Sequence, residues 1–174
     1  MKTPLWKTIL AATDFSAASD VSVSTAARLA EQCGARLLLL HIVELHGGLH
    51  ETTMIQTPGA HELVSAGEFA RTEATRQLLD QARRLVPEPV SMTPVVLIGH
   101  PAECIADHAQ ELGAELIVIG THGRKGLSRV LLGSVAERTV RLSPIPVLTI
   151  RTTDDAAGAT KTTRLQPLDD EGAG

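Results

Sequence analysis

The segment from Gly120 to Ser134 has the residue types that bind phosphate. Its glycines let the backbone approach a ligand closely and adopt positive φ. It follows an apolar run and precedes a predicted helix, whose free N–H groups and positive dipole end favour an anion. Ser134 can donate a hydroxyl hydrogen bond, and Arg124 and Lys125 add positive charge nearby. These features predict a phosphate-binding loop.

Other interpretations of this segment are weaker or stay open. It has no Gly-Lys-Ser/Thr tripeptide, so it is not a P-loop, and its glycine spacing differs from the dinucleotide-binding fingerprint. A flexible glycine turn with Ser134 as helix N-cap is the structural alternative. His122 lies inside the segment and could contact a phosphate or act as an acid or base, but no partner residue is visible beside it.

The elements around this loop alternate between strands and helices. Apolar runs and helical spacing predict strands over 7–12, 36–43, 95–98, 115–119 and 147–150, and helices over 17–32, 61–86, 101–112 and 134–142. Ser16 is a predicted N-cap and Gly34 a predicted C-terminal glycine. Residues 44–60 read as a loop, and the polar residues 152–174 as a disordered tail. This order predicts a parallel sheet with helices on both faces.

Ligands in such folds bind beyond the carboxyl ends of the strands, where the strand order reverses. That rule selects four places in this chain: Thr13-Asp14, Val43-Glu44, Gly99-His100 and the segment from Gly120 onward. Asp14 is expected to contact the ligand, and its alternative role is to cap the following helix, whose dipole favours a carboxylate.

Composition narrows the class of protein. The chain has 174 residues, 43% of them hydrophobic and 2% aromatic, with a net charge of -4. This argues against a binder of nucleic acid or anionic membranes, which would carry a basic face. Cys33 and Cys104 are expected to be buried thiols in a reducing compartment. With no secretory signal pattern and no apolar run long enough to span a bilayer, the expected location is the cytoplasm.

The remaining histidines show no metal-binding pattern. His41 lies within a predicted strand and is expected to be packed and hydrogen-bonded. His46, His50 and His61 flank the 44–60 loop, and their spacing matches no common set of metal ligands, so they are interpreted as solvated.

The chain also resembles a known family. G-T-H-G, nine residues and then G-S is similar to the ATP-binding signature of universal stress proteins. A-T-D-F-S, L-L-L-L-H-I-V, G-H-P-A-E-C-I, A-E-L-I-V-I-G-T-H-G and V-R-L-S-P-I-P-V-L-T-I agree with it in order. The resemblance covers about residues 5–151. It implies one nucleotide-binding domain over 1–151, followed by the tail at 152–174.

The resemblance implies a three-layer α/β/α fold, like the adenine nucleotide alpha hydrolases, with an open parallel sheet of five strands in the order 3-2-1-4-5. It also implies ATP as ligand, with Mg²⁺ held mainly by phosphate oxygens and water, and possibly by Asp14. The Val43 backbone would bind adenine, and Ala12 and Ile119 would flank the base. Asp14 would lie by the ribose and phosphates, and the remaining contacts would come from Gly120, His122, Gly123, Gly133, Ser134 and Val135.

The function implied is that of a nucleotide-dependent regulatory module in stress tolerance. The family pairs two copies through the last strand, which implies a homodimer through about Ile145 to Arg151. A slow ATPase or phosphotransferase using the same site is the alternative, with Asp14 and His122 as the nearby candidates for a base. A partner-binding module with an empty pocket is a third interpretation, and the sequence assigns no catalytic residue.

Overall fold

The sheet and its helices follow the predicted alternation. The computed structural model describes residues 5–56, 63–121 and 133–151. The main sheet has five parallel strands in the order β5-β2-β1-β6-β7. These are β1 Thr8–Ala12, β2 Arg36–Val43, β5 Met92–Ile98, β6 Leu116–Gly120 and β7 Val147–Ile150. The predicted order 3-2-1-4-5 is therefore confirmed.

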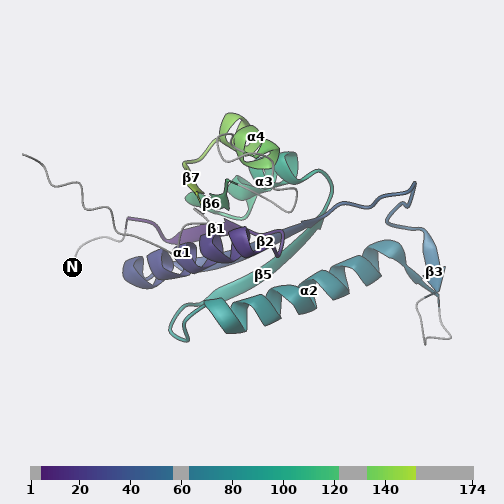
Figure 1. Cartoon of the computed structure of the whole chain (residues 1–174), viewed down its shortest axis with the longest axis horizontal. Coiled ribbons are helices and arrows are strands. Elements are labelled where there is room, and N and C mark those ends of the chain that lie inside the picture. Colours follow the sequence, from purple (N-terminus) through teal and green to yellow (C-terminus); the bar gives the residue numbers. More distant parts are fainter. Residues whose placement is uncertain (1–4, 57–62, 122–132, 152–174) are drawn as a thin grey trace, which may run out of the picture.

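Helices cover both faces of this sheet, as Figure 1 shows. The helices α1 (Ala17–Cys33) and α2 (Ala66–Leu85) lie on one face, and α3 (Pro101–Glu111) and α4 (Ser134–Leu142) lie on the other. Each face has its own hydrophobic cluster. Ile9, Leu37 and Val118 belong to the cluster under α1 and α2, whereas Leu10 and Ile117 belong to the cluster under α3 and α4. This alternation along buried strands gives the three-layer fold.

Local signals explain the ends of α1. The side chain of Ser16 accepts a hydrogen bond from the N–H of Ser19, and Gly34 ends the helix in the left-handed conformation at φ 64. Both caps agree with the sequence-based expectation. Cys33 and Cys104 are free and half-buried rather than fully buried. They pack against opposite clusters, so the sheet separates the two thiols.

The segment between β2 and α2 contains a hairpin that the sequence did not predict. The strands β3 (Met54–Gln56) and β4 (Leu63–Ser65) pair antiparallel at the start of α2, away from the main sheet (Figure 1). The helix consequently begins at Ala66 rather than at His61. The side chain of Ser65 caps it by accepting from the N–H of Glu68 at 3.1 Å.

The strand β5 is also longer than predicted, because it starts at Met92 and includes Pro94. A proline lacks the N–H that a central strand needs, but β5 lies at the edge of the sheet, where that donor is not required. The other edge strand is β7. No helix in the described parts of the chain is long and apolar enough to cross a membrane.

Gly99 ends β5 in a conformation that other residues rarely adopt, with φ 151. A Cβ atom there would lie 2.6 Å from the Sγ atom of Cys104. We expect Gly99→Ala to lower the free energy of unfolding by about 2 kcal/mol, because it adds both backbone strain and a steric clash. Urea unfolding measures this loss. Adding Cys104→Ala should recover the part caused by the clash, and an unchanged midpoint for Gly99→Ala would show that this turn is not strained.

Candidate functional site

The predicted site residues come from strands that are neighbours in the sheet. β1 and β6 pair in parallel, with Ala11 opposite Val118. Continuing this register by three residues brings Asp14 opposite Thr121, just after both strands end. The chain leaves β1 toward α1 on one face and β6 toward α4 on the other (Figure 1). This is the position at which open α/β sheets bind ligands.

The turn after β1 is held by side-chain hydrogen bonds. An oxygen of the Asp14 carboxylate accepts from the N–H of Ser16 at 3.0 Å and from its hydroxyl at 2.6 Å. Phe15 adopts φ 63, and its N–H donates to the hydroxyl oxygen of Thr13 at 3.0 Å. Asp14 thus supports the N-cap Ser16 rather than capping α1 itself.

His41 completes this turn from the neighbouring strand β2. Its Nδ1 atom lies 2.8 Å from the carbonyl oxygen of Thr13, and its ring centroid lies 4.3 Å from that of Phe15. The expectation that His41 is packed and hydrogen-bonded is confirmed. The turn that carries Asp14 is therefore fixed by groups from two strands.

The N-cap residue of α4 has no side chain that could cap the helix. Gly133 is its N-cap residue and Ser134 its first helical residue, so the alternative in which Ser134 caps the helix is wrong. The N–H of Gly133 donates to the carbonyl of Thr121 at 2.6 Å, which ties the start of the helix to the end of β6. The first-turn N–H groups from Ser134 onward have no intrahelical acceptor. Ser134 and Val135 are both exposed residues, and the backbone N–H groups of a helix start favour an anion.

The backbone of β2 corrects one predicted contact. The carbonyl of Val43 accepts from the N–H of Gly99 at 3.0 Å, so it points toward β5. The carbonyl of Leu40 instead accepts from the N–H of Thr13, on the β1 side. Because direction alternates along a strand, Ile42 shares the direction of Leu40 and faces the space beyond β1. The Val43 carbonyl is therefore not available to a base, whereas the backbone of Ile42 borders the predicted site.

Ala12 and Ile119 lie on one face of the sheet. They are 7% and 6% exposed, and both belong to the cluster under α3 and α4. Ala136 in the first turn of α4 belongs to the same cluster. Gly120 is half-buried at the end of β6. His122, Gly123, Arg124 and Lys125 lie outside the described residues.

A depression of about 420 Å³ opens beside the start of α4. Its lining includes Ser134 and Val135, and also Glu44 and His100, which follow two of the strand ends that the sequence selects. The sequence did not predict the other lining residues, Pro101, Ala102, Glu103 and Arg138. Two contacts between charged or titratable side chains lie in its lining. Arg138 of α4 lies 2.5 Å from Glu103 of α3, and Nδ1 of His100 lies 3.9 Å from a carboxylate oxygen of Glu44.

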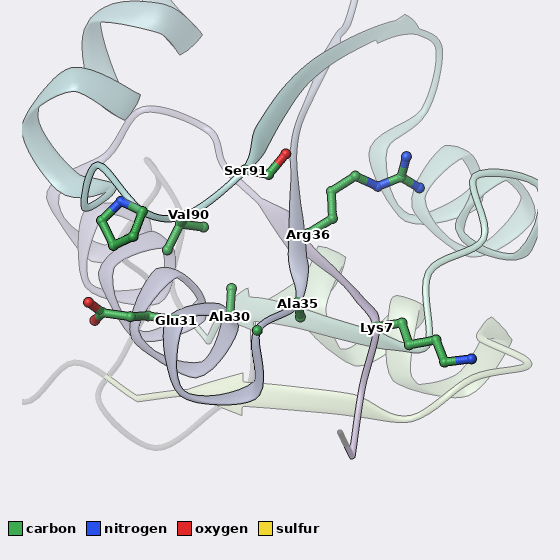
Figure 2. A pocket seen from close by; sticks show the side chains of 9 residues that line it. Lys7, Ala30, Glu31, Ala35, Arg36, Val90 and Ser91 are labelled. Carbon is green, nitrogen blue, oxygen red and sulfur yellow. The ribbon is translucent and has the colours of Figure 1, made fainter. Parts of the chain in front are cut away.

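A second depression, of about 330 Å³, lies at the opposite, amino-terminal edge of the sheet. Figure 2 shows that the side chains of Lys7 and Arg36 extend away from the side on which Glu31 and Val90 lie. Its polar groups therefore do not converge as a ligand site requires. The carboxyl edge remains the candidate site.

The described residues offer neither a metal-binding cluster nor an activated thiol at Cys104. They include no group of three or more His, Cys, Asp or Glu side chains placed to hold a metal ion. Burial raises the pKa of the Cys104 thiol, and the Asp107 and Glu103 carboxylates raise it further. A thiol with a raised pKa is a poor nucleophile.

Known proteins have sequences similar to that of this chain. Residues 5–151 match the Universal stress protein family. A universal stress protein of Methanocaldococcus jannaschii is 32% identical over 148 residues, which are 84% of this chain and 83% of that protein. The chain therefore belongs to the universal stress protein family.

Two solved structures with bound nucleotides share the fold. A universal stress protein in complex with cAMP is 22% identical with a TM-score of 0.60, over 85% of this chain and 98% of that one. A universal stress protein from Archaeoglobus fulgidus in complex with dAMP is 20% identical with a TM-score of 0.54, over 84% of this chain and 98% of that one. At these identities the likeness establishes the architecture.

Proposed function

We propose that this chain binds an adenine nucleotide, ATP with Mg²⁺, at the carboxyl edge of its sheet. The observation that supports the proposal most is the start of α4, where the N-cap Gly133 provides no side-chain cap and the first N–H groups of the helix lie at the position where the strand order reverses. Such a helix start binds phosphate through its amides and its dipole. The cAMP and dAMP complexes of related folds support an adenine nucleotide as the ligand class.

The proposed residue roles follow from this placement. Gly120, Gly133 and the amides of Ser134 and Val135 would contact phosphates and ribose, together with His122 and Gly123. Asp14 would lie by the ribose and phosphates. Ala12 and Ile119 would flank the base, and the backbone of Ile42 takes the adenine contact first assigned to Val43. Mg²⁺ would be held mainly by phosphate oxygens and water, as this ion often is.

Binding would make the chain a regulatory module in stress tolerance, acting as a homodimer through β7. The apolar edge strand supports pairing of two copies. The unpaired thiols of Cys33 and Cys104 agree with a cytoplasmic setting.

The direct test is to denature protein purified from cells and to identify the released small molecules by mass. We expect an adenine nucleotide in an amount approaching one per chain. The proposal fails if the protein releases none and also shows no ATP binding by calorimetry.

The Asp14→Ala variant separates binding from catalysis. The carboxylate of Asp14 already accepts two hydrogen bonds from Ser16, which makes it a weak general base. We therefore expect phosphate release from ATP to be slow in the wild type and to change less than about threefold in the variant, whereas removing a true catalytic base costs about 100-fold or more. Robust turnover that disappears in Asp14→Ala would favour the ATPase alternative.

A further inference from the structure

The depression beside α4 has a wall that phosphate binding does not explain. Besides Ser134 and Val135 at the helix start, its lining includes the carboxylates of Glu44 and Glu103 and the imidazole of His100. Carboxylates repel phosphates, so this wall is suited to another part of the ligand. It fits a group that donates hydrogen bonds.

The strand β2 places Glu44 on the face where a base would lie. The side chains of Leu38, Leu40 and Ile42 all pack in the cluster under α3 and α4. Because side chains alternate along a strand, Glu44 continues the same row one step beyond the end of β2. The residues proposed to flank the base, Ala12 and Ile119, belong to that cluster too.

The charged side chains around Glu44 leave its carboxylate oxygens able to accept a hydrogen bond from a ligand. The nearby cation Arg138 is engaged by Glu103 at 2.5 Å. Among the residues that the structure describes, the nearest charged or titratable partner given for Glu44 is Nδ1 of His100 at 3.9 Å, which is longer than a hydrogen bond. Its side chain is 44% exposed and lines the depression. An ionised carboxylate in this position has lone pairs to offer and no proton to give.

We propose that Glu44 determines base specificity by accepting a hydrogen bond from the 6-amino group of a purine. This inference rests on the proposed nucleotide binding at the same site. A 6-amino group donates to a carboxylate, whereas the 6-oxo group of hypoxanthine or guanine presents an acceptor and is repelled. The backbone of Ile42 also discriminates between 6-amino and 6-oxo bases, and this contribution remains when Glu44 is replaced. Glu44 adds to this discrimination and makes the site select adenine nucleotides.

The test compares binding of ATP and inosine triphosphate, which differ at the 6-position of the base. Calorimetry gives both dissociation constants for the wild type, for Glu44→Gln and for Glu31→Gln. The side-chain amide that Glu44→Gln introduces can donate as well as accept, so a 6-oxo base becomes acceptable. Glu31 is the matched control, because it is an exposed carboxylate lining the depression at the opposite edge of the sheet.

We expect the wild type to prefer ATP, and Glu44→Gln to reduce the ratio of the two affinities by about tenfold. Most of the change should come from tighter binding of inosine triphosphate, which loss of fold cannot produce. Glu31→Gln should leave the ratio unchanged. If Glu44→Gln keeps the ratio within about twofold of the wild type, the role of Glu44 is refuted while nucleotide binding stands. If the wild type binds neither nucleotide, the proposed function itself fails.

Discussion

Replacing Gly133 with valine is expected to weaken ATP binding by at least about 100-fold, because it removes access to two or more charge-assisted hydrogen bonds. The branched side chain would stand in front of the amides of Ser134 and Val135, where the phosphates are proposed to bind. Gly133 has φ -59, which valine can adopt, so the fold should persist with only a small loss of stability. Isothermal titration calorimetry measures the affinity, and thermal unfolding monitors the fold.

The variant Gly133→Asp separates binding from folding. Aspartate is a preferred N-cap residue, and its side chain would accept from the first-turn N–H groups, to which Gly133 offers no side chain. It should therefore preserve or raise the stability of the fold while it repels and replaces the phosphate. Opposite changes in stability and affinity are expected in this one variant. If both Gly133 variants bind ATP as the wild type does, the start of α4 is not the phosphate site.

Changing Leu148 to aspartate is expected to convert the proposed homodimer to a monomer. Leu148 lies in the middle of the edge strand β7 and is 37% exposed, with Val140 and Leu142 of α4 exposed as well. A charge at the centre of an apolar interface costs several kcal/mol when two copies bury it, about enough to shift association more than 100-fold. Light scattering after size-exclusion chromatography measures the mass in solution.

Met54→Asp is the matched control for this experiment. Met54 is an apolar residue of β3 that is 56% exposed, away from the main sheet. It should leave the mass in solution unchanged. If Met54→Asp gives a monomer and Leu148→Asp stays dimeric, the two copies pair through the hairpin rather than through the last strand.

The sequence predicts the main elements because their signals are local. Ser16 and Gly34 mark the ends of α1 by capping, and continuous apolar runs mark buried parallel strands. The hairpin of β3 and β4 was missed because each strand has three residues, too short for a periodic pattern to appear. Pro94 concealed the first half of β5, because the edge position that tolerates a proline is a property of the folded sheet.

The site could be predicted only in part. Strand ends and glycines locate Asp14, Gly120 and Ser134, but the direction of a backbone group depends on how neighbouring strands pair. For that reason the adenine contact was assigned to Val43 rather than to Ile42. Arg138 was missed for a similar reason, since the packing of α3 against α4 brings it beside Glu103 in the depression. Glu44 follows a strand end that the sequence selects, and alternation along β2 was the available signal for the face on which it lies.

The central claim is that the backbone amides at the start of α4 bind the phosphates of an adenine nucleotide. Titrating ¹⁵N-labelled protein with ATP and Mg²⁺ and following the amide resonances tests it directly. We expect saturable shifts at Gly120, Gly133, Ser134 and Val135, and none at Gly34, Ala35 or Ser91 around the opposite depression. Shifts confined to that opposite edge, or no shifts at the start of α4, would contradict it.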